Sequence, residues 1–239
     1  MNKLNLILVG AALTMPVVAK ASVIGSFHDF TMGGRMWNTT KGVCSPCHAA
    51  HKSDNKEKQL VPLWGHAYST TKAFTLYSSP TMQAPVGQPT GASLACLSCH
   101  DGTVAINQKI DGEMIGTPPE YIDEAAKVGP DLHTTHPISF VYSSYTNNPS
   151  LNNPLSYRIG TATALGIAPV PLVWSGTSLM DKTLDEALLD REHKVQCSSC
   201  HDVHASIGSS ASKGGHLLKI DGTDSSGRGS LLCRNCHLK

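Results

Sequence analysis

The sequence predicts a mostly irregular fold, with short α-helices and minimal β-structure. Only 5% of the 239 residues are aromatic, whereas the chain holds 21 glycines and 14 prolines. That is a poor composition for a core built from side chains alone. The stretches at 78–92 and 141–178 are rich in turn residues and show no sustained periodicity. Eight cysteines, all gathered in four short motifs, complete the evidence for this fold class.

Each of the four motifs reads C-x-x-C-H, and they lie at residues 44–48, 96–100, 197–201 and 233–237. C-x-x-C-H is the attachment signature of c-type haem. Two thiols at this spacing can form thioethers to both vinyl groups of one haem, and the adjacent histidine supplies an axial nitrogen to the iron. We therefore expect four covalently attached haem c groups. The attachment residues are Cys44, Cys47, Cys96, Cys99, Cys197, Cys200, Cys233 and Cys236, and the proximal ligands are His48, His100, His201 and His237.

Other uses of C-x-x-C pairs are redox dithiols, disulfides and halves of zinc sites. None of these requires histidine directly after the second cysteine, and all four motifs have it. Haem also suits the composition, because each macrocycle brings apolar surface that side chains normally provide. We expect short helices at the C-x-x-C-H sites.

The first 21 residues have the pattern of a Sec signal peptide. Lys3 precedes an apolar run from residue 4 to 19, and Ala19-Lys20-Ala21 fits the small-x-small cleavage site. The run is too short for a transmembrane helix, and we expect no integral membrane span elsewhere. Export agrees with haem attachment, which takes place outside the cytoplasmic membrane.

The charge of the mature chain argues against a nucleic-acid partner. The full chain has a formal charge of +1, and cleavage removes Lys3 and Lys20 and no acid, so the mature chain is at −1. Haem propionates make the loaded protein more acidic still. Nucleic-acid binding needs a basic surface, so we exclude that class.

We read residues 22–239 as one tetrahaem domain. One haem pair lies at 44–100 and a second at 197–237, separated by a segment at 141–190 that has no cysteine and that we expect to be peripheral.

Local patterns predict a few further elements. Residues 120–127 favour a short helix, and residues 181–190 favour an amphipathic one with Asp181 as its N-cap. A hairpin is a candidate within 141–178.

The sixth ligand of each iron decides what a haem can do. Eight histidines remain as candidates: His28, His51, His66, His133, His136, His193, His204 and His216. His51 and His204 each follow a proximal histidine by three residues, in C-H-A-A-H and C-H-D-V-H. That spacing keeps both rings on nearby faces of a helix. One iron cannot take both rings, so we expect the second ring to reach a neighbouring haem.

Two more distal candidates complete the set. His136 precedes Pro137, which favours extended backbone at that position, and we rank it with His51 and His204. His28 is ranked fourth.

The chain resembles the OmcE-type tetrahaem outer-surface cytochromes. The resemblance rests on C-H-x-x-H at the first site, P-L-W-G-H, C-L-S-C-H-D-G-T-V-A, H-P-I-S-F, and the terminal C-S-S-C-H-D-V-H and L-C-R-N-C-H. It covers most of residues 24–237 and is weakest from 141 to 190. C-H-D-V-H departs from the more usual C-H-D-P-H but keeps both histidines in place.

The resemblance implies bis-His haems in a nearly continuous stack, so that the fold is organised around a stacked haem chain. It also implies head-to-tail polymerisation into extracellular filaments, with one axial histidine coming from the next subunit. An early His-Asp-aromatic element recurs in that family, which favours His28. The position of His66 need not be histidine there, which lowers its rank.

The expected function is electron transfer, without enzymatic activity, as a secreted subunit of an extracellular filament at or beyond the cell surface. Its partners would be further copies of the chain, other redox proteins and extracellular electron acceptors. A soluble periplasmic tetrahaem shuttle is one alternative, because the same haem sites serve either role. A multihaem reductase is another, which would need an iron with an open axial position.

Overall fold

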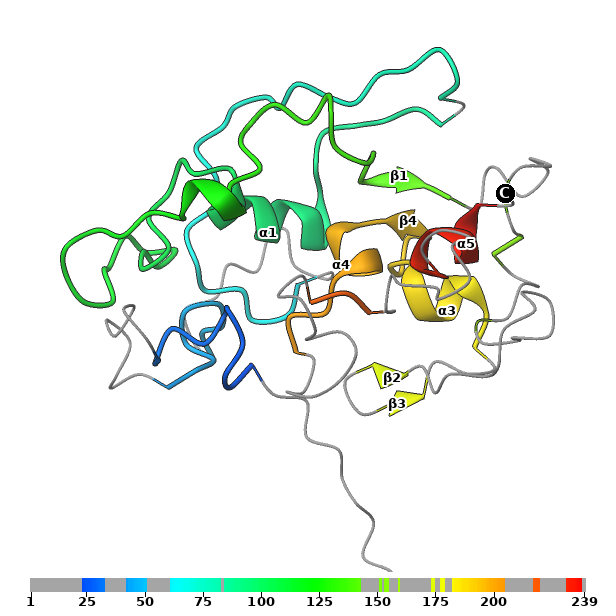
Figure 1. Cartoon of the computed structure of the whole chain (residues 1–239). Helices are drawn as coiled ribbons and strands as arrows, with labels where there is room; N and C mark the ends of the chain where they lie inside the picture. Colours follow the sequence, from blue (N-terminus) through cyan, green and yellow to red (C-terminus); the bar gives the residue numbers. More distant parts are fainter. Residues whose placement is uncertain are drawn as a thin grey trace, which may run out of the picture.

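The fold comes from a computed structural model of the chain. It describes residues 23–32, 42–50, 61–82, 84–142, 182–204, 217–219 and 231–237, together with 151, 153–154, 159, 173–174 and 177–178. The expected signal peptide, His51, His216 and Asp181 lie outside these residues. The described part is mainly turns and irregular backbone, with short helices and two-residue strands (Figure 1).

Three of the four C-x-x-C-H motifs lie on or at the end of a helix. The second motif closes α1 (Gly91–His100), the third forms α4 (Cys197–Cys200), and the fourth closes α5 (Leu231–Cys236). The first motif makes only turns, in which the His48 amide donates to the Cys44 carbonyl at 2.9 Å. Helical or turn backbone brings residues three apart to the same side, so both thiols of a motif can face one group.

Two small antiparallel sheets join parts of the chain. Strand β1 (Phe140–Val141) pairs with β4 (Lys194–Val195), so that Phe140 lies opposite Val195. This pairing brings the chain before the third motif against the segment that follows the second. Strand β2 (Val173–Trp174) pairs with β3 (Thr177–Ser178), within the stretch where a hairpin was a candidate.

Helix α3 (Leu184–Leu188) begins later than the sequence pattern indicated, and our N-cap prediction was wrong. The cap is Thr183, not Asp181: the Thr183 hydroxyl accepts from the Glu186 amide at 3.2 Å, and the Glu186 carboxylate accepts from the Thr183 amide at 2.8 Å. This reciprocal capping box satisfies two amides that would otherwise lack partners. The helix expected at 120–127 is one 3₁₀ turn, η2 (Glu124–Ala126).

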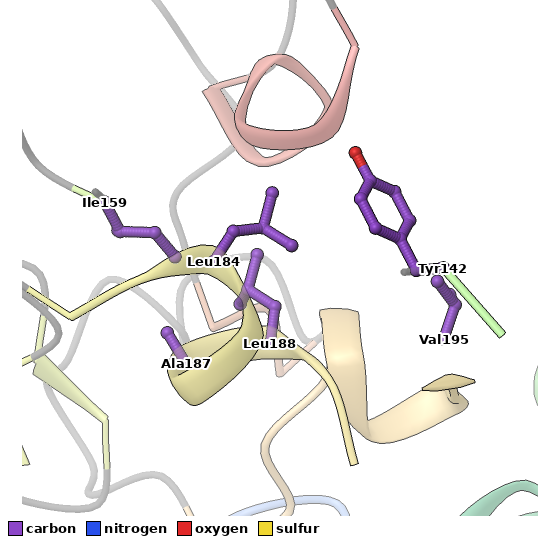
Figure 2. Close-up of a cluster of buried hydrophobic side chains, with 6 residues drawn as sticks. All are labelled: Tyr142, Ile159, Leu184, Ala187, Leu188 and Val195. Atoms are coloured by element: carbon purple, nitrogen blue, oxygen red, sulfur yellow. The ribbon is translucent and has the colours of Figure 1, made fainter. Parts of the chain in front are cut away.

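The larger hydrophobic cluster gathers around α3 (Figure 2). Ile159 and Leu184 have no exposed surface at all. Both belong to the segment 141–190 that we expected to be peripheral, so these described residues of it contribute to the core. Burying a side chain such as leucine stabilises the fold by roughly 1.5–3 kcal/mol. The buried members are Tyr142, Ile159, Leu184, Ala187, Leu188 and Val195.

A second, smaller cluster of Phe74, Leu97 and Leu132 packs against α1. The smaller cluster supports α1. The larger cluster supports α5, because Leu232 and Cys236 of that helix pack against it. Within the described ranges, no helix has the length and apolar character needed to cross a membrane.

Candidate haem sites

The first motif is held by the segment that follows it in the fold, residues 62–65. The Gly65 amide donates to the Cys47 carbonyl at 2.9 Å, and the Ala49 amide donates to the Leu63 carbonyl at 2.8 Å. A Cβ on residue 65 would lie 2.6 Å from the Ala49 Cβ. Glycine at this position therefore allows the two backbones to approach and position His48.

The second motif ends in a buried carboxylate. Asp101, 1% exposed, directly follows His100. One carboxylate oxygen accepts from the amide and hydroxyl of Thr103, both at 2.9 Å, and the other accepts from the hydroxyls of Ser69 and Thr71. These donors stabilise a buried charge that would otherwise be costly. They also fix the turn that carries His100.

The third motif is bracketed by residues 217–219. The Lys219 amide donates to the Cys200 carbonyl at 2.8 Å, and the Asp202 amide donates to the Leu217 carbonyl at 2.7 Å. Asp202 and Lys219 are both buried. Burial lowers the pKa of the Lys219 ammonium to about 8, although the nearby Asp202 favours its charged form.

The fourth motif is tied to the larger hydrophobic cluster. The Tyr142 hydroxyl donates to the Cys236 carbonyl at 3.2 Å. Burial raises the pKa of this tyrosine, and the Cys236 thiol adds to the effect. His237 forms an isolated antiparallel bridge with Leu151. The motif is thus held from two sides.

Three proximal histidines each lie against one of the expected distal histidines. In every case the two rings come from segments far apart in the sequence. The three pairs and their ring-centroid distances and interplanar angles are His28 with His100 (6.1 Å, 42°), His48 with His204 (6.1 Å, 23°) and His136 with His237 (6.4 Å, 75°).

These distances match the requirement of an iron between two imidazoles. With a metal–nitrogen bond of about 2.0 Å and about 1.1 Å from nitrogen to ring centre, two axial rings would have centroids about 6.2 Å apart. Two imidazoles sharing one axis can have any mutual rotation, so all three interplanar angles are compatible. The residues therefore fit haem iron with two histidine ligands.

The hydrogen bonds of the rings fit the same chemistry. In His48, His100 and His136, Nδ1 lies 3.0, 2.8 and 2.8 Å from the backbone carbonyls of Pro62, Ala126 and Pro137. A carbonyl only accepts, so Nδ1 is the donor in each contact, and in the neutral ring this leaves the lone pair on Nε2. Metal-binding histidines are typically oriented in this way, with the second nitrogen donating to a carbonyl or carboxylate.

His66 is a structural histidine. It is 2% exposed, and its Nδ1 and Nε2 lie 2.6 and 3.1 Å from the carbonyls of Ala67 and Ala105. Burial lowers its pKa, against the effect of these carbonyls. Both nitrogens are used within the protein, so the ring joins its loop to the chain that follows α1.

The remaining described histidines lie at the surface or in the third motif. His133 and His193 are exposed, and each has Nδ1 bound to a carboxylate, Asp131 at 2.7 Å and Asp185 at 2.6 Å. His201 is exposed and forms a bridge with Leu218. His51, one of the expected distal ligands, lies outside the described residues.

All eight cysteines lie in the described part of the chain, and none forms a disulfide. The thiols of successive motifs are close to one another. Burial, and after it repulsion from Cys47, raises the pKa of Cys99. Likewise burial, and then repulsion from Cys200, raises the pKa of Cys236 to about 12.

The second and third motifs meet most directly. The Cys96 and Cys197 side chains hydrogen-bond to each other, which raises the pKa of Cys96 and lowers that of Cys197. The four motifs are therefore neighbours in chain order, the first beside the second, the second beside the third, and the third beside the fourth.

Sequence patterns did not indicate the polar residues that hold these sites. The donors around Asp101 come from segments about thirty residues apart, and only the repeated C-H-D at the second and third motifs hinted at a role for the acid. The buried pair of Ser93 and Gln196, which joins α1 to α4, had no signal in the sequence.

No protein-family model matches the chain, and no curated protein matches it significantly.

Proposed function

We propose that this protein carries electrons through four covalently attached haem c groups, each with two histidine ligands. One observation carries the proposal: three motif histidines face three non-motif histidines at 6.1–6.4 Å, the spacing that suits an iron between them. The pairing recurs at three motifs, although each pair joins different segments.

The residues that would hold the haems are those expected from the sequence. The cysteines of each motif would form the thioethers, and the axial pairs would be His100 with His28, His48 with His204, and His237 with His136. We assign the remaining pair as His201 with His51. Bound haem supplies a one-electron iron couple. The protein contributes rigid imidazoles, since carbonyls anchor Nδ1 of His48, His100 and His136.

The adjacency of the motifs supports a continuous path. Hydrogen bonding between Cys96 and Cys197, and the proximity of Cys47 to Cys99, bring attachment points of successive sites together. An electron carrier needs such short steps, whereas four isolated sites would serve separate reactions. The favoured order of haems along the path is the order of the motifs in the chain.

Two histidines at each iron favour a carrier over an enzyme. A multihaem reductase needs one iron with an axial position open to substrate. The three ring pairs would close that position at three sites, and His51 would close the fourth. We therefore propose no enzymatic activity.

The place of action and the assembly are proposed from the sequence. The signal-peptide pattern at residues 1–21 supports Sec export, and the resemblance to OmcE-type cytochromes supports a head-to-tail filament at the cell surface. A head-to-tail contact that does not close into a ring produces an open filament. The partners would then be other copies of the chain, redox proteins and extracellular acceptors.

Haem content and coordination of the secreted protein test the proposal. Intact mass and a pyridine haemochrome assay should report four haems per chain. The absorption and electron paramagnetic resonance spectra should show only low-spin iron in both redox states, with no cyanide binding. Fewer haems, or a high-spin iron that binds cyanide or substrate, would contradict the bis-His carrier.

Electron microscopy of the same material tests assembly separately. Filaments in negative stain would support the extracellular assembly. Discrete small particles at every protein concentration, with all four haems present, would instead favour the periplasmic shuttle.

A further inference from the structure

A largely buried cluster of polar side chains joins the second and third motifs, and the proposed haem chemistry does not use it. It consists of Ser93, Ser139, Asp190 and Gln196, which we call the Gln196 cluster. Ser93 lies on α1, three residues before Cys96, and Gln196 directly precedes Cys197. Ser93 is fully buried, and Gln196 is 1% exposed.

The side-chain amide of Gln196 uses both acceptor positions of its oxygen and one N–H of its nitrogen. Its Oε1 accepts from the Ser93 hydroxyl at 2.5 Å and from the Ser139 hydroxyl at 3.0 Å. Its Nε2 donates to an Asp190 carboxylate oxygen at 2.7 Å. Two hydroxyl donors on one side and a carboxylate on the other permit only one orientation of the amide.

The hydroxyls are themselves fixed by backbone amides. Ser93 Oγ accepts from the Cys197 amide at 3.0 Å, and Ser139 Oγ accepts from the Thr90 amide at 3.0 Å. Each hydroxyl proton must therefore point to Gln196. The Ser93 hydroxyl thus connects α1 directly to the first residue of α4, the attachment residue Cys197.

The cluster acts at the place where two attachment sites meet. Helices α1 and α4, which carry Cys96 and Cys197, pack against each other (Figure 1). Two haems attached through these cysteines would therefore be carried by adjoining helices. A small rotation of α4 relative to α1 would then change the distance and angle between the two macrocycles.

We propose that the Gln196 cluster is a positioning device, which fixes the mutual orientation of the second and third haem sites through the Ser93 contact to Cys197. Its residues touch no iron ligand directly and act through the two attachment cysteines. A network of directional hydrogen bonds suits this role, because it permits one arrangement whereas apolar contacts tolerate several. This inference rests on the proposed haem attachment.

The test measures haem–haem geometry in the full-length, haem-loaded protein. Circular dichroism in the Soret band gives a two-signed couplet when two haems lie close together, and its amplitude depends on their distance and mutual orientation. Ser93→Ala and Gln196→Met should each reduce or reshape the wild-type couplet, while intact mass still reports four haems. The double variant should change it no more than the stronger single variant, because both substitutions break one unit.

Asn107→Leu is the matched control. Asn107 also has a fully buried side-chain amide, but it lies outside the four motifs, and its hydrogen bonds go to the Ile115 and Pro118 carbonyls and the Glu120 amide. Its loss should lower stability without altering the couplet. Should Ser93→Ala fail to mature with four haems, Ser139→Ala removes the other hydroxyl bond to Gln196 from outside both motif helices.

An unchanged couplet in the Ser93, Gln196 and Ser139 variants would overturn the inference, as would an equal change in Asn107→Leu. The proposed function fails differently. Wild-type protein without four haems would contradict the function itself, whereas four haems and an insensitive couplet would contradict only the role of the cluster.

Discussion

His48 and His204 lie nearly parallel, with ring centroids 6.1 Å apart and planes inclined by 23°. His204 follows the third motif by three residues, yet its ring faces the histidine of the first. Sequence spacing alone suggested that this second histidine would serve another haem, without indicating which one. The contact identifies His48 as the histidine that His204 faces, and a substitution of His204 tests this pairing directly.

Replacing His204 with alanine should leave one iron with a single histidine. We expect one of four haems to become high-spin and able to bind cyanide, because no second imidazole remains opposite His48. Absorption and electron paramagnetic resonance spectra of the purified variant measure this. His133→Ala is the control, since His133 is exposed and bound to Asp131, and its spectra should match wild type. Four low-spin haems in His204→Ala would refute the pairing.

Asp101 should lower the reduction potential of the second haem. Its buried carboxylate lies directly after His100, and a negative charge favours ferric over ferrous iron. Asp101→Asn should therefore raise one reduction potential by tens of millivolts. A unit charge about 10 Å from the iron, at an effective dielectric constant of about 20, contributes roughly 1–2 kcal/mol. For a one-electron couple, about 59 mV corresponds to 1.4 kcal/mol. A spectroelectrochemical titration measures the four potentials.

The exposed Asp131 provides the control for that titration. Asp131→Asn should leave all four potentials close to wild type, because solvent screens its charge. Equal shifts in both variants, or none in Asp101→Asn, would show that the buried carboxylate does not tune the haem.

Lys219 should make stability depend on pH in the alkaline range. Burial lowers its pKa to about 8 from an ordinary 10.5. Between these values the folded protein has lost a proton that the unfolded chain retains, so the free energy of unfolding should increase as pH rises through this window. The total gain is at most about 3 kcal/mol. Denaturant titrations at pH 8 and pH 10 measure it.

The difference between variants isolates this lysine from other titrating groups. Lys219→Met should lose the part of the pH dependence that Lys219 contributes, whatever its absolute stability. Lys72→Met, at an exposed position, should keep the wild-type dependence. An identical rise in wild type and Lys219→Met would mean that the buried lysine is not its source.

Leu184 should be among the residues most important for the larger hydrophobic cluster. It has no exposed surface, and truncation leaves a cavity beside Ile159 and Leu188. We expect Leu184→Ala to cost about 2–4 kcal/mol of unfolding free energy, measured by denaturant titration. Leu63→Ala at a 52% exposed position should cost much less. Comparable losses would argue against a core centred on α3.

Local patterns predicted some elements well and others poorly. The helix turns at the motifs depend on neighbouring residues, and three of the four motifs lie on helices. The cap of α3 is Thr183, which has capping-box spacing to Glu186, whereas the sequence pattern indicated Asp181. Ile159 and Leu184 are fully buried although they belong to the segment 141–190, because their burial depends on tertiary packing that no local pattern indicates.

The sequence by itself determined the number and kind of candidate haem sites, since C-x-x-C-H is complete within five residues. It also identified the pool of distal histidines. Only the tertiary structure decided that His204 faces His48, that His28 faces His100, and that the motifs adjoin in chain order. The physical reason is that thioether attachment is local in the chain, whereas an axial pair needs two segments to pack at one distance. That packing depends on contacts such as the Gln196 cluster, whose members come from distant parts of the sequence.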